Sequence, residues 1–467
     1  MTIPAIPQDD LAGAIAAGLL EAAIAAAGLD PVAAPAQGWR QLGLFLARTN
    51  RATLAIPCFQ HSLSFDPNQA ACLSALCVLL MRTHRLAEAV RAGEQAVALQ
   101  PNDPAFLDNL ALALADAGRV DEARICLIRA IGLAPDRAES HLSLAQLLLS
   151  IGEMQPGWLE YEWRNRTEMA RNTVPETSAA SWNGMRMPHG RLIVICDQGY
   201  GDTLQFARYL PHVAALCPDL HLCVSPPLKT LLDRVPGPVA LHTRWEDVPP
   251  HAAVVRLSSL PFLFRTELDT IPSAAGYLRA GDAARARWAM PAGGPAGRLR
   301  VGLVWAGRDT HPNDMRRSIP LSALLPLADQ TGVCFVCLQR PVPAADQGLL
   351  DRFGMEDLSA RLESFDDTAA LIETLDLVIA VDTSTAHLAG ALGRPCWLML
   401  GHPPDWRWLL SGSTTPWYDS ITLFRQPAPG DWAGTIGAVA ARLTALLATP
   451  LTTPVATLLA PTATDER

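Results

Sequence analysis

The sequence predicts an N-terminal α-solenoid of helical repeats followed by a two-lobed, Rossmann-like α/β region. Three observations support this fold class: an internal repeat of 34 residues, a change near Arg191 to short apolar strands alternating with helices, and a Gly/Pro-rich break over 291–297. The chain has 467 residues, more than one hydrophobic core usually accommodates, which favours several domains.

The repeat is marked by prolines that follow successive helix pairs. Pro67, Pro101 and Pro135 lie 34 residues apart. Other positions keep the same phase, as in Leu76, Leu110 and Leu144. A helix–turn–helix unit of this length is typical of the tetratricopeptide repeat (TPR), and at least three such units are needed to bury a continuous core. We therefore expect about four repeats.

The α/β region is predicted from apolar runs that alternate with helical patterns. The expected strands are Arg191–Cys196, Leu220–Ser225, Ala253–Leu257, Arg300–Trp305, Val333–Leu338, Leu377–Val381 and Cys396–Leu400. This alternation implies parallel sheets with crossover helices. The expected domains are a helical cap (1–36), the TPR array (37–168), a linker (169–189), a short first lobe (190–296), a second lobe (297–448) and a disordered tail (449–467).

Composition limits the function classes. Asp and Glu number 46 against 37 Lys and Arg, so no basic excess is present to grip nucleic acid. The 10 cysteines are scattered, and Cys334 with Cys337 is one CxxC pair that cannot complete a zinc site, so we expect reduced thiols and no metal. No signal peptide is visible, which favours the cytoplasm. The apolar segment 11–29 is interrupted by Glu21; a helix capping the array and a membrane helix are both open interpretations, the first being preferred.

The first candidate site follows the strand that starts the α/β region. Gly199 and Gly201 permit a tight turn, and Asp202 falls at the start of the next helix. Ligands of parallel α/β sheets bind at the carboxyl ends of the strands, where this turn lies. The alternative is an aspartate that merely caps the helix.

The second candidate site follows the strand Leu377–Val381. Asp382, Thr383, Ser384 and Thr385 form a hydroxyl-rich turn at a helix N-terminus, where backbone N–H groups and the helix dipole favour an anion. Plain capping by the hydroxyls is the alternative. His387 lies in the first helical turn, and both a core histidine and a phosphate or ribose contact are open.

The third candidate site follows the strand Arg300–Trp305. Gly307 lies in the loop, and Arg316 and Arg317 precede the next helix. An arginine can bind a pyrophosphate through two parallel hydrogen bonds. The alternative is a solvated basic loop. Taken together, the three sites predict a nucleoside diphosphate in one lobe that faces a carboxylate in the other.

These motifs resemble those of the bacterial lipopolysaccharide heptosyltransferases over about 190–445. Asp382-Thr383-Ser384-Thr385-Ala386-His387 through Pro395 looks like that family's donor-binding segment, Arg317–Pro320 like its donor-phosphate motif, and Gly201-Asp202 like the Gly-Asp that carries its proposed base. The family has the GT-B fold. The repeat region, the segment 198–209 and Pro404-Asp405-Trp406-Arg407-Trp408 look like a bacterial group of TPR-fused relatives. The first lobe is shorter than is typical, so heptose as the sugar is not implied.

The resemblance implies an inverting, metal-independent glycosyltransferase without a cofactor other than its nucleotide-sugar co-substrate. Asp202 would be the base, while Gly199, Gly201, Gly307, Arg316, Arg317, Asp382, Thr383, Ser384, Thr385 and His387 would surround the donor. The acceptor would be a protein or glycan held by the TPR groove. The alternatives are an inactive TPR scaffold that binds a nucleotide sugar and, more remotely, an epimerase that acts on one.

Overall fold

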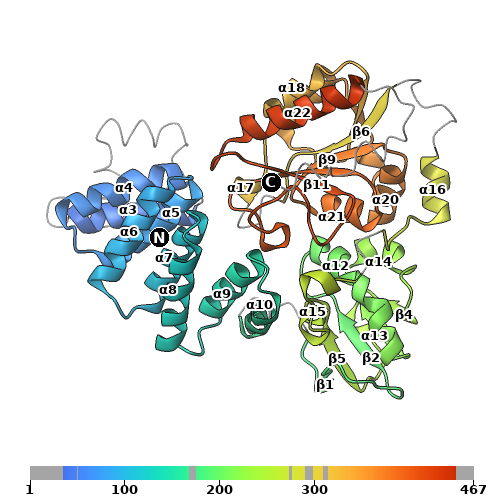
Figure 1. Cartoon of the computed structure of the whole chain (residues 1–467), viewed down its shortest axis with the longest axis horizontal. Helices are drawn as coiled ribbons and strands as arrows, with labels where there is room; N and C mark the ends of the chain where they lie inside the picture. Colours follow the sequence, from blue (N-terminus) through green and yellow to red (C-terminus); the bar gives the residue numbers. More distant parts are fainter. Residues whose placement is uncertain are drawn as a thin grey trace. The chain divides into compact units, whose positions relative to one another are not determined.

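The computed structural model describes residues 35–49, 51–167, 175–272, 276–289, 298–308 and 314–448 (Figure 1). Most of the expected N-terminal cap, the Gly/Pro-rich break and the expected tail lie outside these ranges. The chain divides into two compact units, Met1–Leu147 and Leu148–Arg467, and each is described by itself. N-terminal TPR-like helical repeats followed by parallel α/β sheets confirm the coarse fold prediction.

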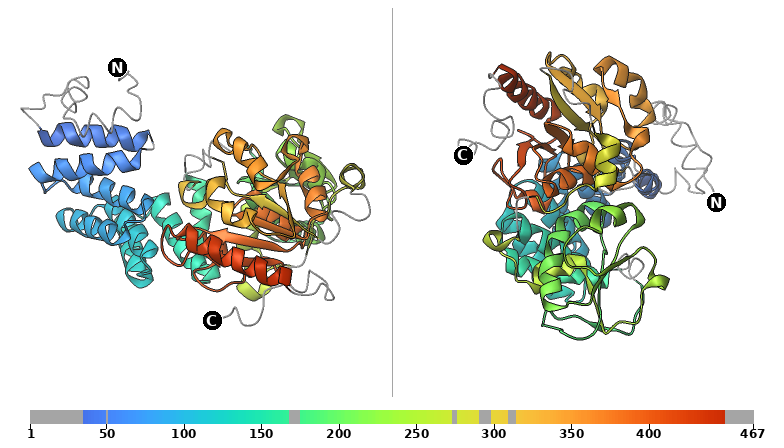
Figure 2. Two further views of the ribbon diagram at one scale, coloured as in Figure 1. Left: turned by 90° about the horizontal axis from the view of Figure 1, so that it is seen from above. Right: turned by 90° about the vertical axis from the view of Figure 1, so that its right-hand side faces the viewer.

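The first unit consists of antiparallel helix pairs with a constant period (Figure 2). Its helices are α3 (Pro35–Arg48), α4 (Ala52–Phe65), α5 (Ala70–Arg82), α6 (Leu86–Leu99), α7 (Pro104–Asp116), α8 (Val120–Leu133) and the start of α9 (Ala138–Ser150). Ala89 and Ala123, one repeat apart, are fully buried, because a small side chain there lets adjacent helices approach closely. Asp103 caps α7 by accepting from the N–H of Ala105 at 2.9 Å, with Pro104 as the first helical residue.

The last expected repeat helix belongs with the α/β region. Helix α10 (Met154–Tyr161) and the 3₁₀ turn η1 (Glu162–Arg166) lie in the second unit, although the sequence placed them in the array. The reason is the burial of large side chains: Trp158 is 1% exposed, and its indole N–H donates to the carbonyl of Thr266 at 3.0 Å.

Within the described residues, the second unit contains a five-stranded and a six-stranded sheet, both parallel. The first sheet has the order β1-β5-β2-β3-β4, with β1 (Ala180–Ser181), β2 (Leu192–Ile195), β3 (Leu220–Cys223), β4 (Ala240–His242) and β5 (Ala253–Arg256). Its helices are α12 (Tyr200–Phe206), α13 (Leu210–Leu216), α14 (Pro226–Leu232) and α15 (Leu260–Leu263). Strand β1 lies in the expected linker, and its neighbour Trp182 is buried.

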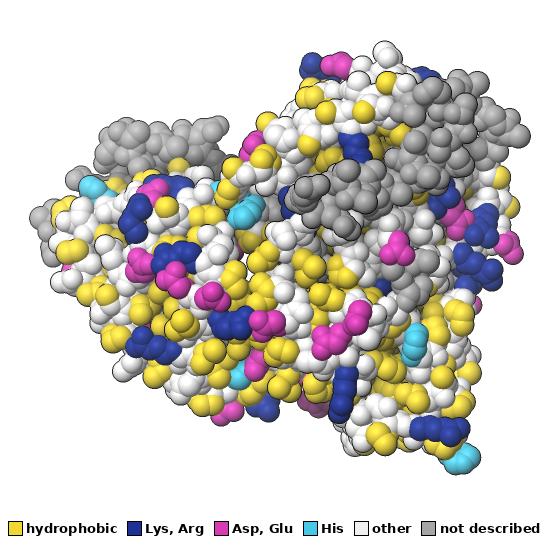
Figure 3. All heavy atoms as spheres, in the orientation of Figure 1, with side chains coloured by type: hydrophobic (Ala, Val, Ile, Leu, Met, Phe, Trp, Pro, Cys, Tyr) yellow, Lys and Arg dark blue, Asp and Glu magenta, His cyan; other side chains and the backbone are white. Residues whose placement is uncertain are grey.

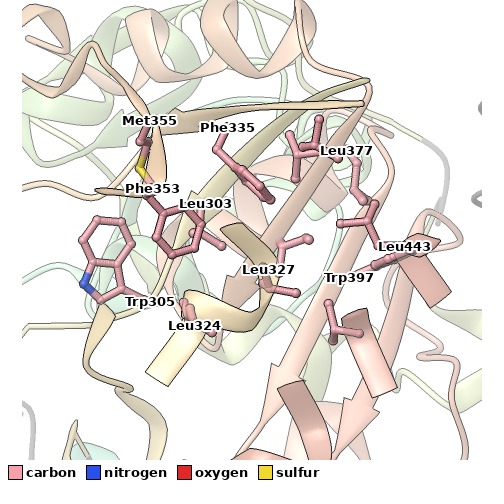
Figure 4. Close-up of a cluster of buried hydrophobic side chains, with 14 of the residues drawn as sticks. Leu303, Trp305, Leu324, Leu327, Phe335, Phe353, Met355, Leu377, Trp397 and Leu443 are labelled. Carbon is pink, nitrogen blue, oxygen red and sulfur yellow. The ribbon is translucent and has the colours of Figure 1, made fainter. Parts of the chain in front are cut away.

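The second sheet has the order β11-β10-β9-β6-β7-β8. Its strands are β6 (Leu299–Val304), β7 (Val333–Cys337), β8 (Glu356–Asp357), β9 (Leu377–Val381), β10 (Cys396–Leu400) and β11 (Ile421–Arg425). Its helices are α17 (Asp314–Arg317), α18 (Leu325–Ala328), α19 (Gln347–Phe353), α20 (Phe365–Glu373), α21 (Ser384–Ala391) and α22 (Trp432–Ala448). Leu303, Phe335, Trp397 and Leu443 belong to one buried cluster that joins the sheet to its helices (Figure 4).

The chain crosses from the first sheet to the second earlier than the expected boundary at 296. Tyr277 and Leu278 already donate their backbone N–H groups to the carbonyl of Ala391, at 2.8 and 2.9 Å. Helix α16 (Asp282–Trp288) then packs on α20, where Arg285 pairs with Glu373 at 2.6 Å. Ion pairs with the carboxylates of α20 therefore attach this segment to the second sheet.

Candidate functional site

The turn after β2 brings two glycines and a carboxylate to the edge of the first sheet. Gly199 is the residue before α12, and Asp202 lies in the first turn of the helix. The Oδ2 of Asp202 accepts the backbone N–H of Gly199 at 3.0 Å. Asp202 therefore helps to cap α12, as the alternative interpretation predicts, but capping uses only one of its two carboxylate oxygens.

The turn after β9 leads directly into the N-terminus of α21. Thr383 precedes α21 with extended backbone, and its hydroxyl donates to the carbonyl of Val381 at 3.2 Å. Thr383 is thus the N-cap residue of α21, but its side chain accepts no hydrogen bond from the first N–H groups of the helix. Ser384 and Thr385 begin the helix and are half-buried, so they are not capping residues. The first N–H groups of a helix lack partners within the helix and favour an anion.

The loop after β6 reaches the same turn through an arginine. The Nη1 of Arg317 donates to the carbonyl of Asp382 at 3.0 Å, and its Nε donates to Asp314 at 3.3 Å. The guanidinium of Arg317 occupies the space that a Cβ atom on Gly307 would take, so a larger residue there would displace the arginine. The backbone carbonyl of Arg316 is directed at Gly401, after β10. The second and third predicted sites are therefore neighbours.

Strand order explains why these loops lie together. Strand β6 continues to β7 and β8 on one side, whereas β9, β10 and β11 follow on its other side. The connections after β6 and β9 leave in opposite directions, which makes this pair the topological switch point of the second sheet. Ligands of open parallel sheets bind in the crevice at such a point.

His387 lies between the two turns. Its Nδ1 lies 3.0 Å from the hydroxyl of Tyr418, and its Nε2 lies 3.9 Å from the Oδ1 of Asp382. A Cβ atom on Gly201 would lie 2.8 Å from the imidazole, so a glycine is needed there. His387 is buried, and burial lowers its pKa well below the ordinary 6.5, with positive charge from nearby arginines as the second cause. The imidazole is therefore neutral at pH 7.

Arg407 connects the two sheets at this point, and sequence reasoning assigned it no role. It forms an ion pair with the Oδ1 of Asp202, its Nε donates to the amide oxygen of Gln205 at 2.7 Å, and its Nη1 donates to Asp405 at 2.8 Å. The Arg407 side chain is 10% exposed. The sequence feature that could have indicated its role is its position between Trp406 and Trp408.

Of the predicted site residues, Asp202, Asp382 and His387 lie near Arg407. Helices α12 and α21 pack together, and the guanidinium of Arg308 lies 5.8 Å from the ring centroid of Tyr200. Asp202 keeps 21% of its side chain exposed and Asp382 keeps 20%. A ligand in this neighbourhood can therefore reach a carboxylate from each sheet.

Burial dominates the electrostatics of both carboxylates. It raises the pKa of Asp202 above its usual range, while Arg407 opposes the rise. Burial and then the charge of Asp405 raise the pKa of Asp382 to about 6. Both side chains therefore bind a proton more readily than an exposed aspartate does, which is the direction expected of a general base.

We predict that Asp382→Asn changes the pH dependence of stability. The folded-state pKa of Asp382, about 6, exceeds its ordinary 3.8, so its contribution to stability is fully present below about pH 4 and is lost as pH rises through about 6. Between about pH 4.5 and about pH 7, the Asp382 carboxyl should lower the free energy of unfolding of the wild type by about 2 kcal/mol. The asparagine variant should not show this decrease. Urea denaturation of both proteins at the two pH values measures this, and parallel curves would contradict it.

The described residues include no group of three or more His, Cys, Asp or Glu side chains that could hold a metal ion. Cys334 and Cys337 are both free thiols; they lie in strand β7, and burial raises the pKa of Cys337 to about 12. Across the described chain, no helix is long and apolar enough to cross a membrane. Figure 3 shows basic and acidic side chains interspersed over the face that it presents.

Comparisons with known proteins support the repeat region directly. The tetratricopeptide repeat family matches residues 105–137, which are α7, α8 and the turn that follows them. Solved structures that resemble the chain include MamA (18% identity, TM-score 0.29, 36% of this chain and all of that one). Another is the first TPR domain of Spaghetti bound to an HSP90 peptide (20% identity, TM-score 0.23, 24% of this chain and 89% of that one). Both TM-scores are low, and neither match bears on the α/β region or on function.

A longer match extends into the α/β region. The chain is 28% identical over 337 residues to Protein FlbA of Caulobacter vibrioides, which covers 66% of this chain. The chain spans 55% of the length of that relative. The TPR repeats are therefore established, and the activity of the α/β region is a matter for proposal.

Proposed function

We propose that the α/β region is a glycosyltransferase of the heptosyltransferase-like, GT-B type that uses a nucleoside-diphosphate sugar. One observation carries the proposal. Asp202, at the carboxyl edge of the first sheet, lies beside the turn Asp382–Thr385, at the switch point of the second sheet, and Arg407 and His387 contact both sides.

The transfer that we propose is inverting and uses no metal. An acceptor hydroxyl would attack the anomeric carbon, forming the new C–O bond as the bond from that carbon to the diphosphate oxygen breaks. The hydroxyl proton would pass to Asp202, whose Oδ1 faces Arg407 and whose Oδ2 faces the N–H of Gly199. A carboxylate has about four lone-pair positions, so positions remain for this proton.

The second sheet would bind the departing nucleoside diphosphate. The N-terminus of α21 and Arg317 would offset its charge, with Arg316 in the same short helix. Gly199, Gly201 and Gly307 would belong to the turns that surround the donor, where they leave room for Asp202, His387 and Arg317. The neutral imidazole of His387 would donate or accept a hydrogen bond and add no charge.

The repeats would bind the acceptor. Stacked TPR helix pairs form extended surfaces that hold protein segments, and TPR domains commonly mediate protein–protein contact. We propose that the acceptor is a protein or a cell-surface glycan held by the TPR groove, and that transfer takes place in the cytoplasm.

A thermal-shift screen over nucleoside diphosphates and their sugars tests the donor side of this proposal. A ligand that binds the folded state raises the melting temperature by mass action, so at least one of these compounds should produce a rise. No rise with any of them would contradict nucleotide binding.

We predict that Arg317→Ala lowers the affinity for the donor identified by that screen by about 10- to 100-fold. A hydrogen bond to a charged group contributes about 1.5–3 kcal/mol to binding. Titration calorimetry measures the affinity. Arg298→Ala is the matched control, since Arg298 lies at the opposite end of β6, where it donates to the carbonyl of Val333 at 2.6 Å. Equal affinities in the wild type and Arg317→Ala would remove this residue from the site.

A second candidate function is an inactive TPR scaffold with a nucleotide-sugar site. The observation that favours it is the ion pair of Asp202 with Arg407, which already gives the carboxylate a structural partner. Donor binding without transfer, unaffected by loss of Asp202, would support this candidate over the first.

A further inference from the structure

The first sheet also has a topological switch point, and the chain's own residues lie at it. Strand β2 continues to β3 and β4 on one side, and β5 lies on its other side. The chain runs from β2 to β3 and β4 and then returns to β5 on the opposite side of β2, so the loops after β2 and β5 start from adjacent strands. Asp197 follows β2, and Ser258 and Ser259 follow β5.

Arg164 of η1 joins these two loops. Its Nε donates to the hydroxyl of Ser258 at 3.0 Å and its Nη2 to the hydroxyl of Ser259 at 2.6 Å. Asp197 accepts from the Ser258 hydroxyl at 2.5 Å and lies 3.7 Å from the Arg164 Nε. Glu162 completes the cluster at 2.7 Å from the Nη1 of Arg164.

Because this cluster is buried, its structure depends on the charge of Arg164. The Arg164 side chain is 5% exposed and that of Asp197 is 1% exposed. A buried carboxylate that loses a cation partner is strongly disfavoured, so removal of Arg164 should displace the Asp197 side chain from this cluster. Asp197 lies in the same turn as Gly199 and Asp202, which places the effect at the candidate base.

The same segment also reaches the second sheet. The ring of Trp158 in α10 meets the ring of Trp406 edge-on at 5.3 Å between centroids, and Tyr161 meets it at 6.2 Å. The guanidinium of Arg407 in turn lies over Trp406, with its central carbon 4.3 Å from the centroid of the Trp406 ring. The segment α10–η1 therefore contacts both the Asp197–Asp202 turn and the loop that carries Arg407.

We propose that Arg164 is a positioning residue for the transfer reaction: by holding Asp197 between the loops after β2 and β5, it sets the place of the Asp202 carboxylate. This rests on the proposed function. The segment α10–η1, which continues the repeat pattern in sequence, thereby forms part of the reactive site. Because Arg164 lies on the first sheet, it does not contribute to binding of the diphosphate at the second.

The test uses the full chain with Arg164→Gln, Arg164→Lys and Arg166→Gln. Arg166 is exposed and lies over the Trp163 ring at 4.0 Å, so its change removes the same charge from the same turn. Arg164→Gln should lower kcat by about 10- to 100-fold with nucleotide affinity unchanged, since small misplacements of reacting groups cost this much. Arg164→Lys should recover part of the loss, and Arg166→Gln should match the wild type.

Hydrogen exchange separates this inference from the proposed function. In Arg164→Gln the amides of 197–206 should exchange faster than in the wild type, whether or not any sugar is transferred. If the wild type binds no nucleotide and transfers no sugar, the function fails while the exchange result still decides whether Arg164 holds the turn. Unchanged exchange, or an equal loss of kcat in Arg166→Gln, would overturn the proposal.

Ser259→Ala keeps the test decisive if Arg164→Gln does not fold. It removes the hydrogen bonds of the Ser259 hydroxyl with Arg164 and Glu162 but leaves both charges in place, so the same changes in kcat and exchange should appear at smaller size. Wild-type behaviour of a folded Ser259→Ala, together with wild-type behaviour of Arg164→Lys, would overturn the proposal.

Discussion

Asp202→Asn should lower the rate of sugar transfer by about 10²- to 10⁴-fold, which is the usual contribution of a positioned general base. Asparagine keeps the shape of the side chain and still accepts the N–H of Gly199, but it cannot take a proton at neutral pH. Donor affinity should change little, because the donor phosphates are proposed to bind at the second sheet. Single-turnover transfer and calorimetric titration of the donor measure the two quantities.

A control is needed because Asp202 also pairs with Arg407. Asp405→Asn removes another carboxylate partner of Arg407, which lies at 2.8 Å, and leaves Asp202 in place. If the rate depends on the base, Asp405→Asn should lose much less activity than Asp202→Asn. Equal losses in the two variants would mean that Asp202 acts by holding Arg407, and undiminished transfer in Asp202→Asn would remove its role altogether.

Trp158→Ala should destabilise the second unit by about 3–5 kcal/mol, the range typical of truncating a buried tryptophan. Its side chain is 1% exposed, bonds to the carbonyl of Thr266, and packs edge-on against Trp406 and Trp417 at 5.3 and 6.4 Å. The variant loses these contacts and leaves a cavity between the first and second sheets. Denaturant unfolding followed by near-ultraviolet circular dichroism measures the change.

Leu159→Ala is the matched control for that experiment. Leu159 follows Trp158 in the same helix but is 57% exposed, so its truncation should cost less than about 1 kcal/mol. A loss below about 1 kcal/mol in Trp158→Ala would show that α10 is not part of the packed α/β unit, contrary to the structure.

The contacts of Arg407 link these predictions. It pairs with Asp202 and Gln205 from the first sheet and with Asp405 from the second, and it lies over Trp406. Trp406 packs against α10, while Arg164 of η1 holds the other turn. The α/β unit is therefore completed by a segment whose sequence resembles one more repeat helix.

Much of the fold follows from local pattern. The 34-residue period predicts the helix pairs, because each repeat has the same spacing of apolar and small residues, and α5, α7 and α9 start 34 residues apart. The apolar run Leu377–Val381 and the hydroxyl-rich turn after it predict β9 and the start of α21, since strand, cap and helix are decided by residues next to one another. The turn Asp382–Thr385 and the turn Gly199–Asp202 could be predicted on the same basis.

Tertiary structure alone decided which of these turns meet and what holds them. The strands β1, β4, β8 and β11 have weak or short patterns and exist because a neighbouring strand supplies their hydrogen bonds. The Asp202–Arg407 pair joins residues 205 positions apart, and the bond from Arg164 to Ser258 spans 94 positions. Such contacts are favourable only after the chain has folded and excluded water from the charges, so no local period or spacing encodes them.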